Sequence, residues 1–142
     1  MTELCSLSAE TLHRLIRARE FSCREVVVAT LEQNDRFNGH PNAFALVDVD
    51  GALAAGEAAD QRLSSGVETG PLHGIPFTVK DLIDTEGIET AFGSYLMQGN
   101  VPTRDAECVR RLKAAGAILI GKTTTPEFAG SVLTESIRYG VT

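Results

Sequence analysis

The chain has 142 residues, of which 43% are hydrophobic and 23% charged, a composition typical of one ordinary soluble globular domain rather than a disordered chain. Its formal net charge is −6, and the basic residues are scattered, which argues against nucleic acid and anionic membrane as partners because both require a basic surface. No apolar run is long enough to span a bilayer, and the first residues lack the order of a signal peptide. We therefore expect a cytoplasmic protein with a small or neutral partner, no nucleic acid and no membrane.

Amphipathic periodicity and end signals predict four helices. Ser8 is the expected N-cap of the first helix, and Ser22 with Glu25 forms the S-x-x-E capping box of the second. Gly66 is expected to close the third helix, and Thr103 to cap the fourth. The helices are predicted over Ala9–Arg19, from Ser22 to about Asn38, over Val49–Ser65 and over Arg104–Ala115.

Short apolar runs between these helices predict buried strands over Ala43–Val47, Ile75–Lys80 and Ala117–Ile120. The chain from Asp81 to Asn100 loses its periodicity, so we expect a loop-rich segment of the kind that often lines a site. Thr125 and Pro126 favour a further helix start, whereas Ser136–Thr142 contain no expected helix or strand. The alternation of strands and helices predicts an α/β fold with an at least partly parallel sheet.

Metal and cofactor signals are weak. Three histidines show no metal-ligand spacing, and three cysteines form no CxxC pair, which indicates free thiols, two of them packing helices. These residues are His13, His40, His73, Cys5, Cys23 and Cys108. We expect no metal and no cofactor.

The segment Gly116–Thr123 fits the phosphate-loop pattern G-x-x-x-x-G-K-[ST]. In a phosphate loop the four residues between the glycines must wrap around phosphate, yet here they are Ala, Ile, Leu and Ile, which favour a buried strand. Pro126 also favours a new helix start, whereas a phosphate loop runs directly into its helix. We therefore interpret this segment as a strand, and a nucleotide-binding protein is the weakest alternative.

Lys80 ends an apolar strand and enters the loop-rich chain, so its side chain shares a face with Pro76 and Thr78. Most lysines in such a position reach solvent or pair with a neighbour such as Asp81. The pairs Asp48/Asp50 and Asp81/Asp84 adjoin turns and helix starts, where carboxylates commonly act as caps. Position alone does not single out a catalytic group.

The segment Gly70–Asp81 closely resembles the motif G-P-L-x-G-[IV]-P-x-x-[VI]-K-D of the amidase-signature family. The resemblance continues in the same order along nearly the whole chain. Further matching segments are Ala91–Ser94, Arg104–Ala106, Ala114–Ile118, Gly121–Thr123, Pro126–Phe128 and Tyr139–Thr142. The chain is thus similar to the N-terminal part of the amidase-signature fold, a mixed β-sheet surrounded by helices, with residues 1–142 forming part of a single domain.

The resemblance implies cleavage of a carboxamide C–N bond by a Ser–cis-Ser–Lys triad, with Lys80 as the catalytic lysine and a small-molecule amide as substrate. A lysine in water holds its proton near neutrality, whereas burial disfavours the charged form. A buried, uncharged Lys80 could therefore accept a proton relayed from the nucleophilic serine. By matching position, Ala129, Gly130 and Ser131 are expected to line the substrate pocket.

The family's Gly-Gly-Ser-Ser-Gly-Gly-Ser run and its nucleophile would follow Thr142, and Ser94, Ser131 and Ser136 do not match them. We therefore expect the 142 residues alone to be inactive. The main alternative is a non-catalytic binding or interaction module derived from an amidase. The sequence also leaves open the substrate, the choice between a general amidase and a transamidation subunit, and the oligomeric state, a homo-oligomer included.

Overall fold

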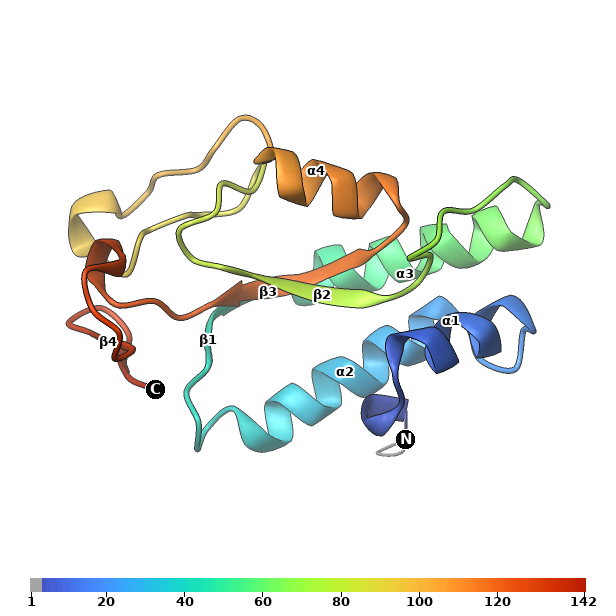
Figure 1. Cartoon of the computed structure of the whole chain (residues 1–142), viewed down its shortest axis with the longest axis horizontal. Coiled ribbons are helices and arrows are strands. Elements are labelled where there is room, and N and C mark those ends of the chain that lie inside the picture. Colours follow the sequence, from blue (N-terminus) through green and yellow to red (C-terminus); the bar gives the residue numbers. More distant parts are fainter. Residues whose placement is uncertain (1–3) are drawn as a thin grey trace. The chain divides into compact units, whose positions relative to one another are not determined.

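The computed structural model describes residues 4–142 (Figure 1), which divide into two compact units. The helical unit consists of the described residues up to Phe37, Asp48–Phe77 and Leu112–Ile120. The loop unit consists of Asn38–Val47, Thr78–Arg111 and Gly121–Thr142. Membership of residues 1–142 in a single domain stays a prediction.

The first two helices begin where their caps predict. Helix α1 (Ala9–Arg17) starts after Ser8, whose Oγ accepts a hydrogen bond from the Thr11 amide at 3.1 Å. Helix α2 (Cys23–Phe37) starts after Ser22, whose amide donates to Glu25 Oε2 at 2.8 Å while Ser22 Oγ accepts from the Glu25 amide at 3.0 Å. This reciprocal pair is the predicted capping box, and it satisfies amides that have no partner within the helix.

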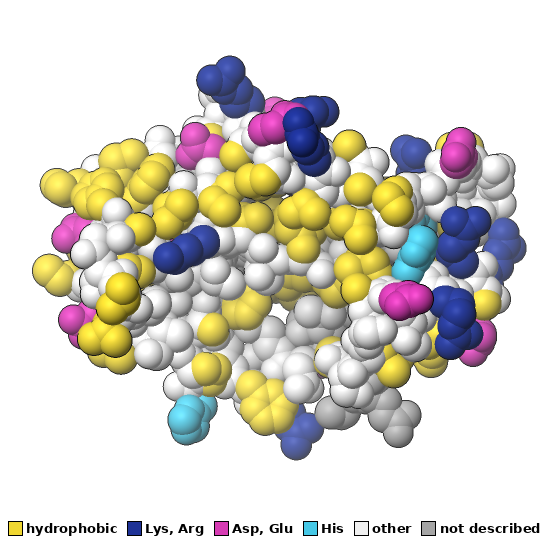
Figure 2. Space-filling model, viewed as in Figure 1, with side chains coloured by type: hydrophobic (Ala, Val, Ile, Leu, Met, Phe, Trp, Pro, Cys, Tyr) yellow, Lys and Arg dark blue, Asp and Glu magenta, His cyan; other side chains and the backbone are white. Residues whose placement is uncertain are grey.

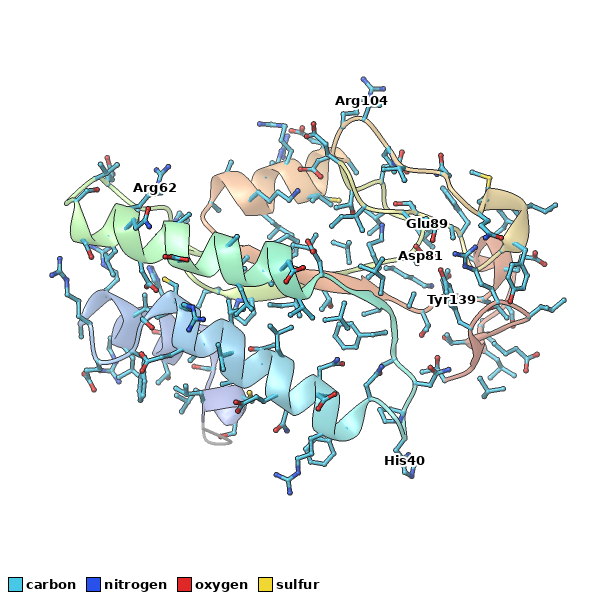
Figure 3. The ribbon with its side chains drawn as sticks, turned by 180° about the vertical axis from the view of Figure 1, so that it is seen from behind. His40, Arg62, Asp81, Glu89, Arg104 and Tyr139 are labelled. Carbon is cyan, nitrogen blue, oxygen red and sulfur yellow. The ribbon has the colours of Figure 1, made fainter. Side chains whose placement is uncertain are left out.

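Helix α3 (Val49–Ser64) lies beside α2, and both views of the ribbon show the two helices side by side (Figures 1 and 3). A Cβ atom on Gly56 would lie 3.2 Å from the Arg24 Cα, so the small residue permits a close approach between the helices. Asp60 of α3 also accepts hydrogen bonds from the Cys23 and Arg24 amides, at 2.7 and 3.1 Å. A carboxylate at a helix N-terminus is stabilising, so Asp60 caps α2 from its neighbour.

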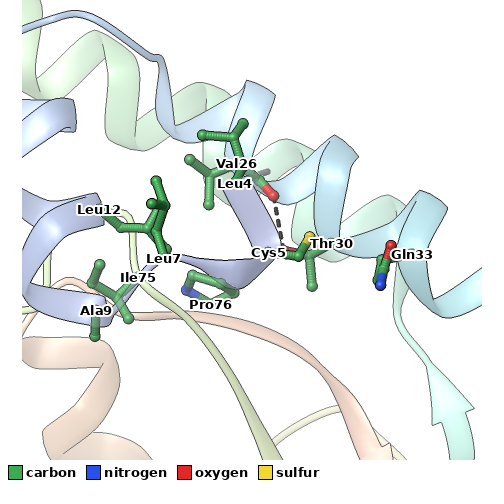
Figure 4. Close-up of a pocket in the computed structure, with 10 residues that line it drawn as sticks. All are labelled: Leu4, Cys5, Leu7, Ala9, Leu12, Val26, Thr30, Gln33, Ile75 and Pro76. Carbon is green, nitrogen blue, oxygen red and sulfur yellow. Dashed lines mark hydrogen bonds between the residues drawn. The ribbon is translucent and has the colours of Figure 1, made fainter. Parts of the chain in front are cut away.

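The core of the helical unit is apolar. Ile16 of α1 and Val27 of α2 are completely buried, and Ile120 is 1% exposed. An apolar pocket of about 300 Å³ opens between the 3₁₀ helix η1 (Leu4–Ser6), α1, α2 and the start of β2 (Figure 4). None of the helices within residues 4–142 is long and apolar enough to cross a membrane.

The main sheet contains β1 (Phe44–Val47), β3 (Ile118–Thr123) and β2 (Pro76–Lys80), in that order. Strand β1 pairs with β3 in the antiparallel sense. The Ile118 amide donates to Ile75 O, and the Asp81 amide donates to Thr123 O. The residue numbers increase together along both strands, so β2 and β3 are parallel. The sheet is therefore mixed, and the predicted α/β class is confirmed.

Gly121 is required by the pairing of β1 with β3. A Cβ atom at this position would lie 2.2 Å from Leu46 O, closer than any side chain tolerates. The second glycine of the phosphate-loop pattern thus serves strand packing.

Several local predictions are wrong. Helix α4 (Glu107–Ala114) begins three residues later than predicted, so Thr103 is not its N-cap. The intervening residues are held in a loop, because the Ala106 amide donates to Asp84 O and Asp105 Oδ1 accepts from the Glu86 amide. Thr125 caps nothing, since its hydroxyl donates to Pro126 O and only the 3₁₀ helix η3 (Glu127–Ala129) follows.

The C-terminal residues were expected to contain no strand, yet β4 (Glu135–Ser136) and β5 (Gly140–Val141) form a short antiparallel hairpin. The hairpin is held by its own ladder and by Asn42, whose amide group donates to Tyr139 O at 2.7 Å and Val141 O at 3.1 Å. The three cysteines are free as predicted, but Cys23 alone among them is buried.

Candidate active site

Lys80 is the last residue of β2, where the sequence predicts it. Its neighbour Val79 points into the core, and Lys80 itself is exposed. No hydrogen bond or ion pair joins its ammonium group to another residue within 4–142. Residues 4–142 therefore do not supply the burial that a lysine needs to act as a neutral base.

Asp81 has a role that the sequence pattern did not predict. Its carboxylate is 1% exposed and caps no helix, contrary to the expectation for the Asp81/Asp84 pair. It accepts hydrogen bonds from the Ala91 amide at 3.1 Å, the Gly93 amide at 3.3 Å and the Tyr139 hydroxyl at 2.9 Å. Figure 3 shows Asp81 beside Tyr139. A buried carboxylate is stable when its lone pairs are satisfied in this way.

The turn that Asp81 binds has a strained backbone. Phe92 and Gly93 both have positive φ angles, 55° and 67°. A Cβ atom on Gly93 would lie 2.5 Å from Thr125 O, so glycine is required both by conformation and by space. Positive φ at a phenylalanine is uncommon and persists where surrounding contacts fix it. Here the Phe92 amide donates to Asp81 O at 2.8 Å.

The same turn leads to the predicted substrate residues. Phe92 O accepts a hydrogen bond from the Phe128 amide at 2.8 Å, and the two rings stack with centroids 6.1 Å apart. Phe128 and Ala129 have φ angles of 47° and 56°, a second strained stretch. Main-chain hydrogen bonds thus run from Asp81 through Phe92 to Phe128, next to the predicted pocket residues.

Ala129, Gly130 and Ser131 are all exposed. The Ser131 hydroxyl oxygen accepts a hydrogen bond from the Leu133 amide at 3.1 Å. Their role in substrate binding stays a prediction. Ser94 is buried and donates to Glu127 Oε1 at 2.6 Å, so its hydroxyl acts as a structural link.

Lys122 is fully buried, and its ammonium group donates to Ile83 O at 2.5 Å, Thr90 Oγ1 at 2.7 Å and Thr85 Oγ1 at 3.2 Å. Burial lowers the pKa of Lys122 from its usual value, partly opposed by nearby aspartates, chiefly Asp81. The lysine of the phosphate-loop pattern is therefore bonded internally and the residues before it form β3, which confirms the rejection of that motif. The apolar run Ala117–Ile120, which ends two residues before Lys122, was the sequence signal that this lysine lies in a buried strand.

The C-terminal hairpin is tied to the same loops. Arg138 forms an ion pair with Glu89 at 2.6 Å and lies over the rings of Tyr95 and Tyr139. Burial, with the hydrogen bond to Asp81, raises the pKa of Tyr139 to about 12. Among residues 4–142 no cluster of three or more His, Cys, Asp or Glu side chains is placed to hold a metal ion.

The mixed sheet and its helices form the fold of a known family. The family model described as Amidase matches residues 25–142, and the chain belongs to the amidase-signature family. It is 43% identical, over all 142 residues, to a glutamyl-tRNA(Gln) amidotransferase subunit from Salinispora arenicola (strain CNS-205).

Solved structures give the same result. The chain is similar to fatty acid amide hydrolase with a TM-score of 0.93 at 26% identity, covering 99% of this chain and 25% of that one. It is similar to the peptide amidase from Stenotrophomonas maltophilia with a TM-score of 0.89 at 31% identity, covering 100% of this chain and 30% of that one. The match to the Salinispora protein covers 29% of its length, so the chain spans less than a third of these relatives.

Proposed function

We propose that this chain is the N-terminal part of an amidase that hydrolyses carboxamide C–N bonds, with Lys80 as its catalytic base. The observation that carries this proposal is the position of Lys80, at the end of β2 within the segment Gly70–Asp81, in a chain whose family match runs from residue 25 to 142. The substrate is a small-molecule amide, and the protein is cytoplasmic.

The remaining steps need groups outside these 142 residues. A covering segment would desolvate Lys80 and favour its neutral form. The neutral Lys80 amine would take a proton, through a cis-serine, from a nucleophilic serine that attacks the amide carbonyl. The same proton would return to the leaving nitrogen as the C–N bond breaks, which leaves an acyl-enzyme and a neutral amine. Water would then hydrolyse the acyl-enzyme. Ala129, Gly130 and Ser131 would contact the substrate.

The test uses a chimera in which these 142 residues replace the matching 30% of the S. maltophilia peptide amidase. Acyl transfer from simple aliphatic and aromatic amides to hydroxylamine reports turnover. Lys80→Ala should lower kcat about 10²- to 10⁴-fold, the range that positioned acid–base groups contribute. Lys80→Arg should be no better, because arginine holds its proton near neutral pH.

Lys113→Ala is the matched control, since Lys113 is an exposed lysine on α4. Near-normal turnover by Lys80→Ala would make Lys80 an ordinary strand-end lysine. The 142-residue chain alone should be inactive, and an enzymatic rate from it would place the chemistry on Ser94 or Ser131. A folded chimera that binds amides without turnover would favour the non-catalytic module.

A second candidate is an amidotransferase subunit, favoured by the 43% identity to the Salinispora protein. This subunit would release ammonia from an amide donor for transfer rather than free hydrolysis. When these 142 residues replace the matching part of the Salinispora protein, the resulting chimera should then hydrolyse glutamine. A preference of this chimera for unrelated amides would favour the general amidase. Sedimentation of either protein gives the oligomeric state, a homo-oligomer included.

A further inference from the structure

Lys80 has no side-chain partner within residues 4–142, so its placement depends on the main chain that carries it. The next residue, Asp81, forms hydrogen bonds through its amide, its carbonyl and its carboxylate. Its amide donates to Thr123 O at 2.9 Å, and its carbonyl accepts from the Phe92 amide at 2.8 Å. Its carboxylate accepts from two further amides and from the Tyr139 hydroxyl. The main chain is therefore fixed immediately after the lysine.

These bonds bring three separate segments to one residue: Thr123 to the main-chain amide of Asp81, and the turn and Tyr139 to its carboxylate. Thr123 ends β3, Ala91–Gly93 form the strained turn, and Tyr139 belongs to the hairpin. The hairpin is held a second time by Arg138, whose guanidinium bonds Glu89 and, at 3.4 Å, Ser94 O. Asp81 thus joins the end of β2 to both the turn and the hairpin.

We propose that Asp81 is a positioning residue for Lys80: its buried carboxylate ties the Ala91–Gly93 turn and the C-terminal hairpin to the end of β2 and so fixes the direction in which the Lys80 side chain leaves the sheet. This inference rests on the proposed function of Lys80. Misplacing a catalytic group by about 1 Å lowers the rate of an enzyme about 100-fold. Hydrogen bonds that fix the direction of the Lys80 side chain therefore affect catalysis.

Replacing one carboxylate oxygen by an NH₂ group isolates the contribution of the Asp81 hydrogen bonds to the position of Lys80. Asp81→Asn keeps the size of the side chain and one accepting oxygen. Its NH₂ group cannot accept the hydrogen bonds that Gly93 and Tyr139 donate to Oδ2. Tyr139→Phe removes only the hydroxyl from the same contact and is the milder variant.

Both variants are tested in the peptide amidase chimera. Asp81→Asn should lower kcat about 10- to 100-fold with KM changed less than about threefold, because transition-state geometry and not binding is altered. Tyr139→Phe should lower kcat less, and the double variant should match Asp81→Asn, since coupled residues are not additive. Asp50→Asn and Tyr95→Phe are matched controls at exposed positions and should leave kcat unchanged.

Amide hydrogen exchange of the segments 91–94 and 135–142 gives a readout that does not need activity. Asp81→Asn should accelerate exchange in both segments at least about tenfold, and Tyr139→Phe should do so mainly in the second. Unchanged exchange overturns the proposal. Accelerated exchange with normal kcat also overturns it, because Asp81 is then structural only. If the parent chimera is inactive but Asp81→Asn still accelerates its amide hydrogen exchange, the proposed function is refuted. The role of Asp81 in holding the turn and the hairpin to the end of β2 is then still supported. If Asp81→Asn fails to fold, Tyr139→Phe decides.

Discussion

The buried side chains of the helical unit are nearly all apolar, whereas those of the loop unit are largely polar. Among the described residues, Ile16, Val27 and Ile120 represent the first unit. Asp81, Thr90 and Lys122 represent the second. Apolar burial is non-directional and holds helices together over broad faces. Hydrogen bonds to buried charges are directional, so they suit a loop whose backbone must be held in one unusual conformation.

The two units also differ in their surfaces. The helical unit exposes a few large apolar side chains, such as Val67 at 54%. The loop unit exposes more of them and more completely, among them Leu96, Val132 and Ile137. Figure 2 shows hydrophobic side chains gathered where Figure 1 places the C-terminal residues and the Tyr95–Met97 segment. Exposed apolar patches of this kind favour association with another protein surface.

The largest effect should come from breaking the polar interior of the loop unit at its buried cation. Lys122→Met removes the ammonium group that donates to Ile83 O, Thr85 Oγ1 and Thr90 Oγ1, and Ile83 O keeps its hydrogen bond from the Thr85 hydroxyl. We expect a loss of about 2–3 kcal/mol of unfolding free energy. Urea unfolding measures it, with Lys113→Met as the exposed control. Equal or higher stability would mean that the cost of desolvating the ammonium exceeds the value of its three hydrogen bonds.

A medium effect should appear as a pH dependence of the Tyr139 contact. The pKa of Tyr139 is raised from 10 to about 12, so the folded state binds this proton more tightly than the unfolded state. Its contribution to stability is then complete below pH 10 and is lost as pH rises from 10 through 12. Wild type should lose more stability than Tyr139→Phe over that window in urea unfolding.

Lys122 titrates in both proteins, so the difference between wild type and Tyr139→Phe isolates the phenol. Tyr95→Phe is the matched control, because Tyr95 is 58% exposed. Parallel pH curves for wild type and Tyr139→Phe would contradict the Asp81–Tyr139 hydrogen bond. The titration window lies above neutral pH, so the contact is intact under ordinary conditions.

The smallest effect on stability should come from the exposed surface. Val132→Ser and Ile137→Ser, at positions 99% and 89% exposed, should change the unfolding free energy by less than about 0.5 kcal/mol. They should nevertheless reduce self-association of the 142-residue chain in sedimentation, whereas Val67→Ser in the helical unit should not. A monodisperse wild-type chain with a sharp melting transition would contradict this and favour an independent module.

Local signals in the sequence were sufficient for most of the secondary structure. Ser8, the Ser22/Glu25 box and Gly66 mark helix ends correctly, because a cap involves residues three or four positions apart. The position of Lys80 at the end of its strand was also predicted from neighbouring residues, because the apolar run before it identifies the strand. Thr103 failed as a cap because distant Asp84 and Glu86 bond the residues that follow it.

The partners of the buried charges were decided by the tertiary structure. Lys122 bonds a carbonyl 39 residues away, and Asp81 bonds a hydroxyl 58 residues away. Neither partner leaves a periodic or capping signal near the charged residue, so the sequence could mark Lys122 and Asp81 only as candidates for other roles. The sequence by itself determined most of the helices and the three longer strands, the family resemblance and the position of Lys80. Folding determined which loops are bonded to Asp81, the residue after that lysine, because directional hydrogen bonds form only when distant segments meet.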